Sequence, residues 1–111
     1  MKKAGLFMEL AASYRKHGWE LRGALLQPAS HAELDAHDTE LLKNVPIREA
    51  TFDALWFSRP SHKQREAWEL RLLAQTPYAL FETFEPDETE EERQDVKQEM
   101  EARMRDYACQ K

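Results

Sequence analysis

The sequence predicts an α+β domain in which a mainly antiparallel sheet of about four strands carries an N-terminal and a C-terminal helix on one face. Two observations lead to this class. Apolar residues recur at helical spacing near both ends of the chain, and between the ends they alternate or run together as in strands. Because the chain has 111 residues, we expect a single domain over residues 1–111.

The first helix is indicated by apolar residues at three- and four-residue spacing: Leu6, Phe7, Leu10, Ala11 and Tyr14. Gly18 can adopt the left-handed conformation that ends a helix. Residues 19–25 then alternate between apolar and polar side chains. This alternation predicts a strand with one polar face, which Pro28 ends.

A second, polar helix is expected to run from Ser30 toward Lys43. Ser30 and Glu33 fit a capping box, in which each side chain accepts a hydrogen bond from the other residue's backbone amide. Asn44 would cap the end of this helix, and Pro46 would prevent its continuation. Since few of its residues are apolar, the helix should lie on the outside.

Three further strands are expected over residues 47–58, 66–73 and 78–84. The run Leu55-Trp56-Phe57 is apolar on both faces, which places its strand near the centre of the sheet. Residues 66–73 are of helix-favouring types, but their apolar side chains alternate, and we give the alternation more weight. If they were helical, residues 51–84 would form a β-α-β unit with parallel strands.

The C-terminal helix is expected over about residues 87–108, where neither Gly nor Pro interrupts the chain. Thr89 and Glu92 fit a capping box. Its apolar stripe is narrow and consists of Val96, Met100, Met104 and Tyr107. Glu101 and Arg105 have the spacing of an ion pair along the helix.

The formal net charge of −5 is located in residues 87–95, which hold six acidic residues and one basic residue. The simplest explanation is that acidic side chains complement the positive end of a helix dipole. A second explanation is a docking surface for a basic partner, which would make the chain an acidic inhibitor of a nucleic-acid-binding protein. Binding would then depend strongly on salt.

Several classes of protein are disfavoured by the composition. The single Cys109 allows no disulfide within the chain, so we expect a cytoplasmic protein. Because no apolar stretch is long enough to span a membrane and no basic stripe is present, we expect neither a membrane nor a nucleic-acid partner. Metal-binding and cofactor-binding motifs are absent, and we predict no metal and no cofactor.

One predicted loop gathers side chains that bind anions: Arg59, Ser61, His62, Lys63 and Arg65. Guanidinium, hydroxyl and imidazole groups together can hold a phosphate or a carboxylate. No Gly-rich phosphate-binding sequence accompanies them, so an ordinary polar turn is the competing explanation. Glu82 shares the parity of the apolar residues in the last strand and is a candidate buried acid for the same site.

Large rings are crowded into the predicted strands: Trp56, Phe57, Trp68, Tyr78 and Phe81. Two helices on one face would leave the other face exposing several of these rings, and such patches usually mark an interface. A symmetric homodimer is the commonest way to cover one. The competing explanation is that the middle helix covers the second face.

From the sequence we expect a small cytoplasmic protein that acts by binding and has no catalytic activity of its own. It would form a homodimer through the aromatic-rich sheet face or bind another protein partner. The alternative is a small enzyme or ligand-binding domain that holds an anionic small molecule at residues 59–65. Whether the chain is an enzyme is left open by the sequence.

Overall fold

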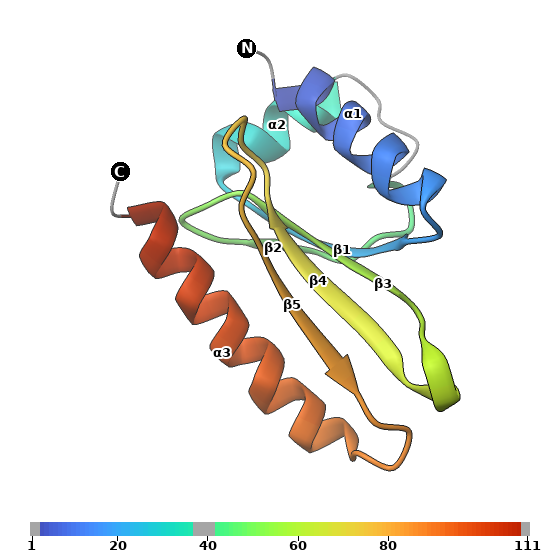
Figure 1. Ribbon diagram of the computed structural model, residues 1–111. Helices are drawn as coiled ribbons and strands as arrows, with labels where there is room; N and C mark the ends of the chain where they lie inside the picture. Colours follow the sequence, from blue (N-terminus) through green and yellow to red (C-terminus); the bar gives the residue numbers. More distant parts are fainter. Residues whose placement is uncertain (1–2, 37–41, 110–111) are drawn as a thin grey trace.

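Five strands form one mixed sheet with helices on both of its faces (Figure 1). The computed structural model describes residues 3–36 and 42–109. In chain order the elements are α1 (Lys3–Lys16), β1 (Glu20–Leu26), α2 (Pro28–Ala36), β2 (Ile47–Glu49), β3 (Ala54–Pro60), η2 (His62–Gln64), β4 (Glu66–Leu72), β5 (Ala79–Phe84) and α3 (Glu90–Cys109).

The strand order is β2-β1-β3-β4-β5, and only the pairing of β1 with β2 is parallel. The α+β class and the mainly antiparallel sheet are therefore confirmed. The sheet has one strand more than expected, because residues 47–58 form two strands, β2 and β3, instead of one. β3 is the central strand, as its two apolar faces predict.

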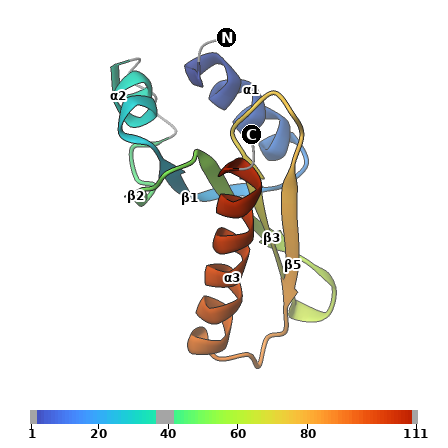
Figure 2. The same ribbon diagram turned by 90° about the vertical axis from the view of Figure 1, so that its left-hand side faces the viewer.

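The helices cover opposite faces of the sheet (Figure 2). Phe7 of α1 and Leu34 of α2 cluster with Phe57 on one face, whereas Met104 of α3 clusters with Trp56 on the other. The prediction that the N-terminal and C-terminal helices share one face is therefore wrong. The physical reason is that β3 carries large apolar side chains on both faces, so each face requires a cover.

A β-bulge interrupts the alternation of β1. Leu21 and Gly23 pair with consecutive residues of β3, which makes Arg22 an extra residue in the strand. Beyond the bulge the parity is reversed, so Leu21 packs on the α1 side of the sheet and Leu25 on the α3 side. The predicted polar face is therefore wrong for the second half of β1, where residues 23–26 are all buried.

β4 is a strand, as its alternation predicts, although its residue types favour a helix. Trp68 and Leu70 pack on the α3 side of the sheet, and Glu69 pairs with Phe57 on the α1 side. β5 pairs with β4 along its whole length and lies within the predicted range 78–84. Here the tertiary environment decided the conformation, not the helix propensity of the residues.

α2 begins at Pro28, earlier than the predicted capping box, and proline is favoured in the first turn of a helix. The Ser30 hydroxyl donates a hydrogen bond to Asp53 (2.7 Å), and the Glu33 carboxylate accepts one from the Ala4 amide (3.1 Å). The Ser30–Glu33 capping box is therefore wrong, because tertiary contacts use both side chains.

The other helix ends follow the prediction. Gly18 follows α1 with a φ of 87°, the left-handed conformation expected of it. At the start of α3, the Thr89 amide donates to Glu92 (2.8 Å) and the Glu92 amide donates to the Thr89 hydroxyl (3.1 Å), so this capping box is confirmed. The predicted course of α2 toward Lys43 passes through residues 37–41, which lie outside the described residues.

The acidic tract lies where α3 begins. Glu90, Glu91 and Glu92 form the first turn of the helix. Just before it, the Glu88 carboxylate accepts a hydrogen bond from the Glu85 amide at 2.7 Å. These are the positions that the helix-dipole explanation requires.

A buried carboxylate, that of Asp53, joins four parts of the chain. Asp53 is 3% exposed and precedes β3. It accepts hydrogen bonds from the Gln27 amide (2.8 Å) and the Ser30 hydroxyl (2.7 Å), and it lies 3.2 Å from the Lys3 ammonium. Its backbone carbonyl accepts from the Leu73 amide at 2.9 Å, so α1, α2, β3 and the end of β4 meet at one residue.

Tyr14 anchors α1 to the middle of the sheet. Its ring stacks on Phe57, with centroids 4.1 Å apart, and its hydroxyl donates a hydrogen bond to Glu69. Burial, reinforced by the Glu69 carboxylate, raises the pKa of Tyr14 to about 12. The neutral phenol is therefore the form that the fold favours.

We expect Asp53→Ala to lower the free energy of unfolding by about 3 kcal/mol, because it leaves buried donors unpaired and the Lys3 ammonium without its counter-charge. Urea unfolding monitored by circular dichroism measures this loss. Asp35→Ala, at an exposed position of α2, is the control and should change stability by less than about 0.5 kcal/mol. Equal effects of the two substitutions would contradict the role assigned to Asp53.

We also expect Tyr14 to give the fold an alkaline dependence on pH. The pKa of Tyr14 in the folded chain lies above the ordinary value of 10.0. Tyr14 therefore contributes its full share to the free energy of unfolding below pH 10, and this stabilisation is lost as pH rises toward 12. The difference in unfolding free energy between the protein and Tyr14→Phe should be constant below pH 10 and shrink above it. If the difference in unfolding free energy grows above pH 10 instead, the pKa of Tyr14 is lowered on folding and not raised.

Candidate functional site

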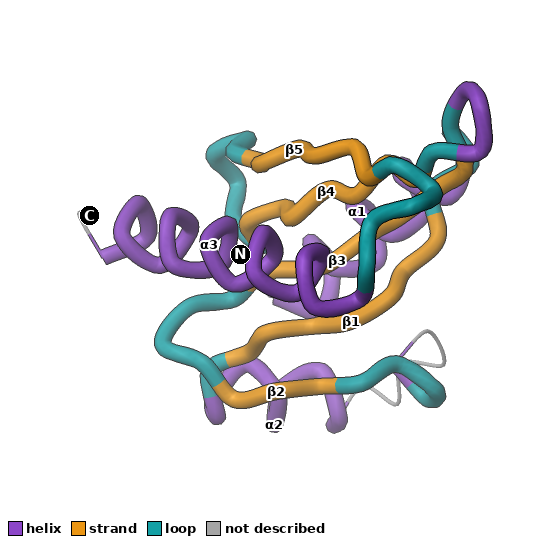
Figure 3. Tube along the Cα trace, turned by 90° about the horizontal axis from the view of Figure 1, so that it is seen from below, coloured by secondary structure: helices purple, strands orange, loops and turns teal. Residues whose placement is uncertain are grey.

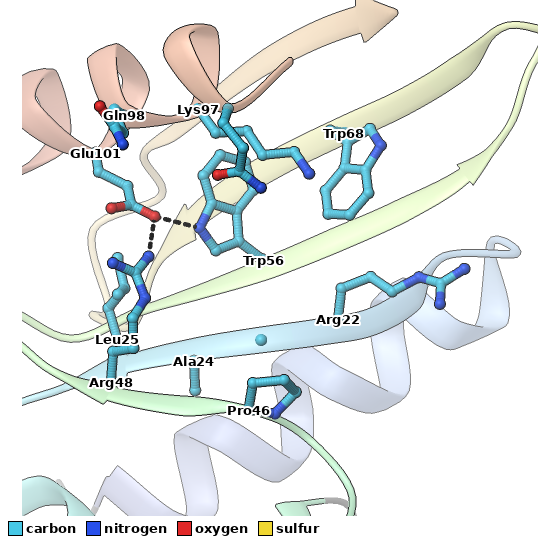
Figure 4. Close-up of a pocket in the computed structure, with 12 residues that line it drawn as sticks. Arg22, Ala24, Leu25, Pro46, Arg48, Trp56, Trp68, Lys97, Gln98 and Glu101 are labelled. Carbon is cyan, nitrogen blue, oxygen red and sulfur yellow. Dashed lines mark hydrogen bonds and ion pairs between the residues drawn. The ribbon is translucent and has the colours of Figure 1, made fainter. Parts of the chain in front are cut away.

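A groove of about 480 Å³ lies between α3 and β1, on the α3 side of the sheet (Figure 4). It exists because α3 packs over β4 and β5, and no other helix of residues 3–36 and 42–109 lies above the neighbouring part of the sheet on this side. In Figure 3, β1 and β2 lie beside α3, not behind it. The volume falls in the range typical of small-molecule sites.

The floor of the groove is aromatic. Trp56 of β3 and Trp68 of β4 are neighbours on this face, with ring centroids 6.0 Å apart in an edge-to-face arrangement. Gly23 of β1 pairs with Trp56 in the ladder and contributes no side chain. A Cβ atom at this glycine would lie 3.6 Å from the Pro46 carbonyl oxygen and 3.9 Å from Trp56, which is ordinary van der Waals contact, so the glycine relieves no clash.

The bulge in β1 positions a guanidinium group at one end of the groove. Because Arg22 is the extra residue, it lines the groove together with its neighbour Gly23. The Arg22 Nε donates a hydrogen bond to the Ser58 hydroxyl at 2.8 Å, which holds the side chain on this side of the sheet. In Figure 4 it marks the end of the groove opposite Arg48.

Lys97 of α3 supplies an ammonium group over the aromatic floor. Its Nζ lies 3.5 Å from the centroid of the Trp68 ring, a cation–π contact. Burial lowers the pKa of Lys97, and the negative charges of Glu90 and Glu66 oppose that shift. Among the described residues, no carboxylate lies within ion-pair distance of this ammonium.

Glu101 closes the other end of the groove. Its carboxylate accepts a hydrogen bond from the Trp56 indole at 2.9 Å and forms an ion pair with Arg48 of β2. The predicted pair between Glu101 and Arg105 is replaced by these contacts, and Arg105 lies 3.7 Å from Asp106. Glu101 therefore orients the indole and the guanidinium group that line this end.

The charges in the groove are unusual for this chain. Its lining contains three cations, Arg22, Arg48 and Lys97, and a single carboxylate, Glu101, whereas the whole chain has a formal net charge of −5. Because cations outnumber carboxylates among the described residues of this lining, the groove raises the local concentration of anions. The groove can therefore attract an anion, and its indole rings can contact an apolar group of the same ligand.

The loop predicted as an anion site lies at the β3–β4 turn and lines no part of this groove. Arg59 donates to the His17 carbonyl at 2.7 Å, and Arg65 pairs with Glu85 at 2.7 Å. The two arginines of the loop are thus directed to separate partners.

The polar residues between those two arginines, Ser61, His62 and Lys63, are exposed. Glu82 is also exposed, opposite Trp68 on β5, and lies outside the lining of the groove. The candidate buried acid is therefore at the surface, on the edge strand β5.

The rings predicted to form an interface lie on both faces of the sheet. Trp56 and Phe57 are buried by helices of the same chain. Trp68 is half-buried at the groove, and Tyr78 stacks on Tyr107 of α3 with centroids 3.6 Å apart. Phe81 differs from the rest, because 58% of its surface is exposed. The face that was expected to be uncovered is thus covered in part by α3, and the groove lies beside this helix.

The sequence identified the two tryptophans but not the residues that make them a site: Arg22, Gly23, Arg48, Lys97 and Glu101. These residues come from three separate elements. The bulge that brings Arg22 to the groove cannot be predicted from the pattern of apolar residues. The spacing of Lys97 and Glu101 on one helix face was the available signal.

No protein-family model, curated protein or solved structure matches this chain. Within the described residues, no helix has both the length and the apolar character needed to cross a membrane. The same residues contain no group of three or more His, Cys, Asp and Glu side chains that could hold a metal ion.

Proposed function

We propose that this chain is a small non-catalytic binding protein of the cytoplasm whose groove binds an anionic molecule with a flat apolar group. The observation that carries the proposal is the placement of Lys97 and Arg22 around the Trp56–Trp68 floor. Charged groups would bind the anion, and the indoles would bind the flat group by stacking and apolar contact.

The contacts within the groove favour binding over catalysis. Glu101 is the one carboxylate in its lining, and it already accepts hydrogen bonds from Trp56 and Arg48. A carboxylate that acts as a general base must be free to take a proton from a substrate. The ammonium, guanidinium and amide groups that remain hold and orient ligands.

The groove is a better candidate for an anion than residues 59–65. In that loop Arg59 and Arg65 are engaged elsewhere and no apolar floor accompanies the exposed Lys63. In the groove, Lys97 has no direct carboxylate partner among the described residues and stands over an indole ring. The anionic ligand that the sequence offered as the alternative function is therefore kept, and its site is moved from residues 59–65 to the groove.

Naphthoate, a carboxylate on a flat apolar ring, is a suitable probe, with the uncharged naphthalenemethanol as its matched control. Titration of isotope-labelled protein should shift the indole N–H signals of Trp56 and Trp68 but not that of Trp19, which packs on the other face. Lys97→Met, which keeps a similar shape against Trp68, should weaken naphthoate binding about tenfold and leave the alcohol unaffected.

Lys63→Met is the control for the loop and should leave the affinity for naphthoate unchanged. If Lys63→Met weakens binding and Lys97→Met does not, the anion binds at the loop and the groove proposal is wrong. Gly23→Val gives an independent check, because its two methyl groups would occupy the space beside Trp56 and should abolish binding of both probes.

Binding should also depend on pH through Lys97. Its pKa is lowered, so the ammonium loses its proton at a lower pH than an ordinary lysine. The affinity for naphthoate should be highest below that pKa, where Lys97 is protonated, and should fall as pH rises through it. In Lys97→Arg, whose charge does not titrate in this range, calorimetric titration should show a flat profile. An equal decline in both proteins would contradict the assignment.

A further inference from the structure

The two edges of the sheet differ in how they are protected against pairing with another chain. β2, at one edge, has three residues, of which Arg48 and Glu49 are charged, and it follows Pro46. Short strands, charges and proline are the features that protect natural edges. β5, at the other edge, has six residues, contains neither lysine nor proline, and has no strand beyond it among the described residues (Figure 3).

The backbone groups of β5 that point outward can be identified. The Tyr78 carbonyl accepts from the Leu72 amide of β4 at 2.9 Å, so the even-numbered residues of β5 direct their backbone groups toward β4. The amides and carbonyls of Ala79, Phe81 and Thr83 therefore point away from the sheet. Consistent with this, the Thr83 amide has only a long contact, 3.4 Å, to the neighbouring Glu82 carboxylate.

We infer that β5 pairs antiparallel with β5 of a second copy of this chain, about a two-fold axis at Phe81. This register places Phe81 opposite Phe81 and Ala79 opposite Thr83, so the outward backbone groups of both strands meet. Two copies would thereby join their sheets into one continuous sheet. The interface is isologous, as expected of a closed dimer.

The charges of β5 are compatible with this register. With the axis at Phe81, Glu82 of one copy lies opposite Leu80 of the other, and no like charges face each other. Moving the axis by one residue to Glu82 would place the two carboxylates directly opposite, which is destabilising. The register centred on Phe81 therefore joins the outward backbone groups without placing like charges opposite each other.

Phe81 gives the pairing its apolar contribution. In the single chain 58% of this ring is exposed, and its aromatic neighbour is the edge of Trp19, 6.3 Å away between centroids. Directly opposite residues in an antiparallel pair are about 5.5 Å apart, so the two Phe81 rings would cover each other. The homodimer expected from the sequence is thus assigned to a sheet edge instead of a sheet face.

Six paired residues bury less area than a standard interface, so we expect a dissociation constant on the order of micromolar. Sedimentation equilibrium of the full chain should show a mass that rises from 13.1 kDa toward twice that value as concentration increases. Phe81→Lys should keep it at the lower mass, because two ammonium groups would meet at the axis. Met8→Lys, at a residue 47% exposed on α1, is the control and should still dimerise.

Hydrogen exchange tests the edge separately from the oligomeric state. As concentration rises, the amides of Ala79, Phe81 and Thr83 should gain protection, whereas those of Leu80 and Glu82 should not change. A monomer throughout the micromolar range would overturn the inference. A dimer that persists in Phe81→Lys would also overturn it. So would a dimer in which amide protection does not alternate along β5. None of these residues lines the groove, so the result of this test does not bear on ligand binding in the groove.

Discussion

The structure depends on one constraint, the burial of β3 from both sides. Its consecutive side chains are large and apolar, so neither face of the sheet can be left to solvent. A helix is about 10–12 Å across and strands are about 4.8 Å apart, so one helix covers only two or three strands. On one side two helices together provide the cover. On the other side α3 acts alone, and the groove is the region of the sheet that it does not reach.

Asp53 shows how the two-helix side is held in place. A carboxylate in the interior would be costly without partners, and here it has an amide and a hydroxyl from the start of α2 and an ammonium group from α1. Its position just before β3 means that the central strand and the helices above it are fixed by the same residue. Local capping rules could not predict this, because the Ser30 hydroxyl donates its hydrogen bond to Asp53 and does not cap its own helix.

Much of the fold could be predicted where a pattern is local. The stripe of α1, the turn at Gly18, the Thr89–Glu92 box and the alternation of β4 are each set by residues close together in the chain. The face covered by α3 and the short parallel strand β2 could not be predicted, because long-range packing decides both. The groove could not be predicted for the same reason. Its tryptophans were identified as aromatic residues, but its cations come from β1, β2 and α3, which only long-range packing brings together.

The bulge at Arg22 also bears on how sequences of this fold can change over generations. Ala24 and Leu26 belong to the core beneath α1, and Leu25 to the core beneath α3, because one extra residue precedes them. Losing or gaining a residue between Leu21 and Ala24 would turn all three toward the wrong layer. Replacing Arg22 would leave both cores intact. In diverging descendants, the length of this stretch should therefore be inherited more faithfully than the identity of the residue that creates it.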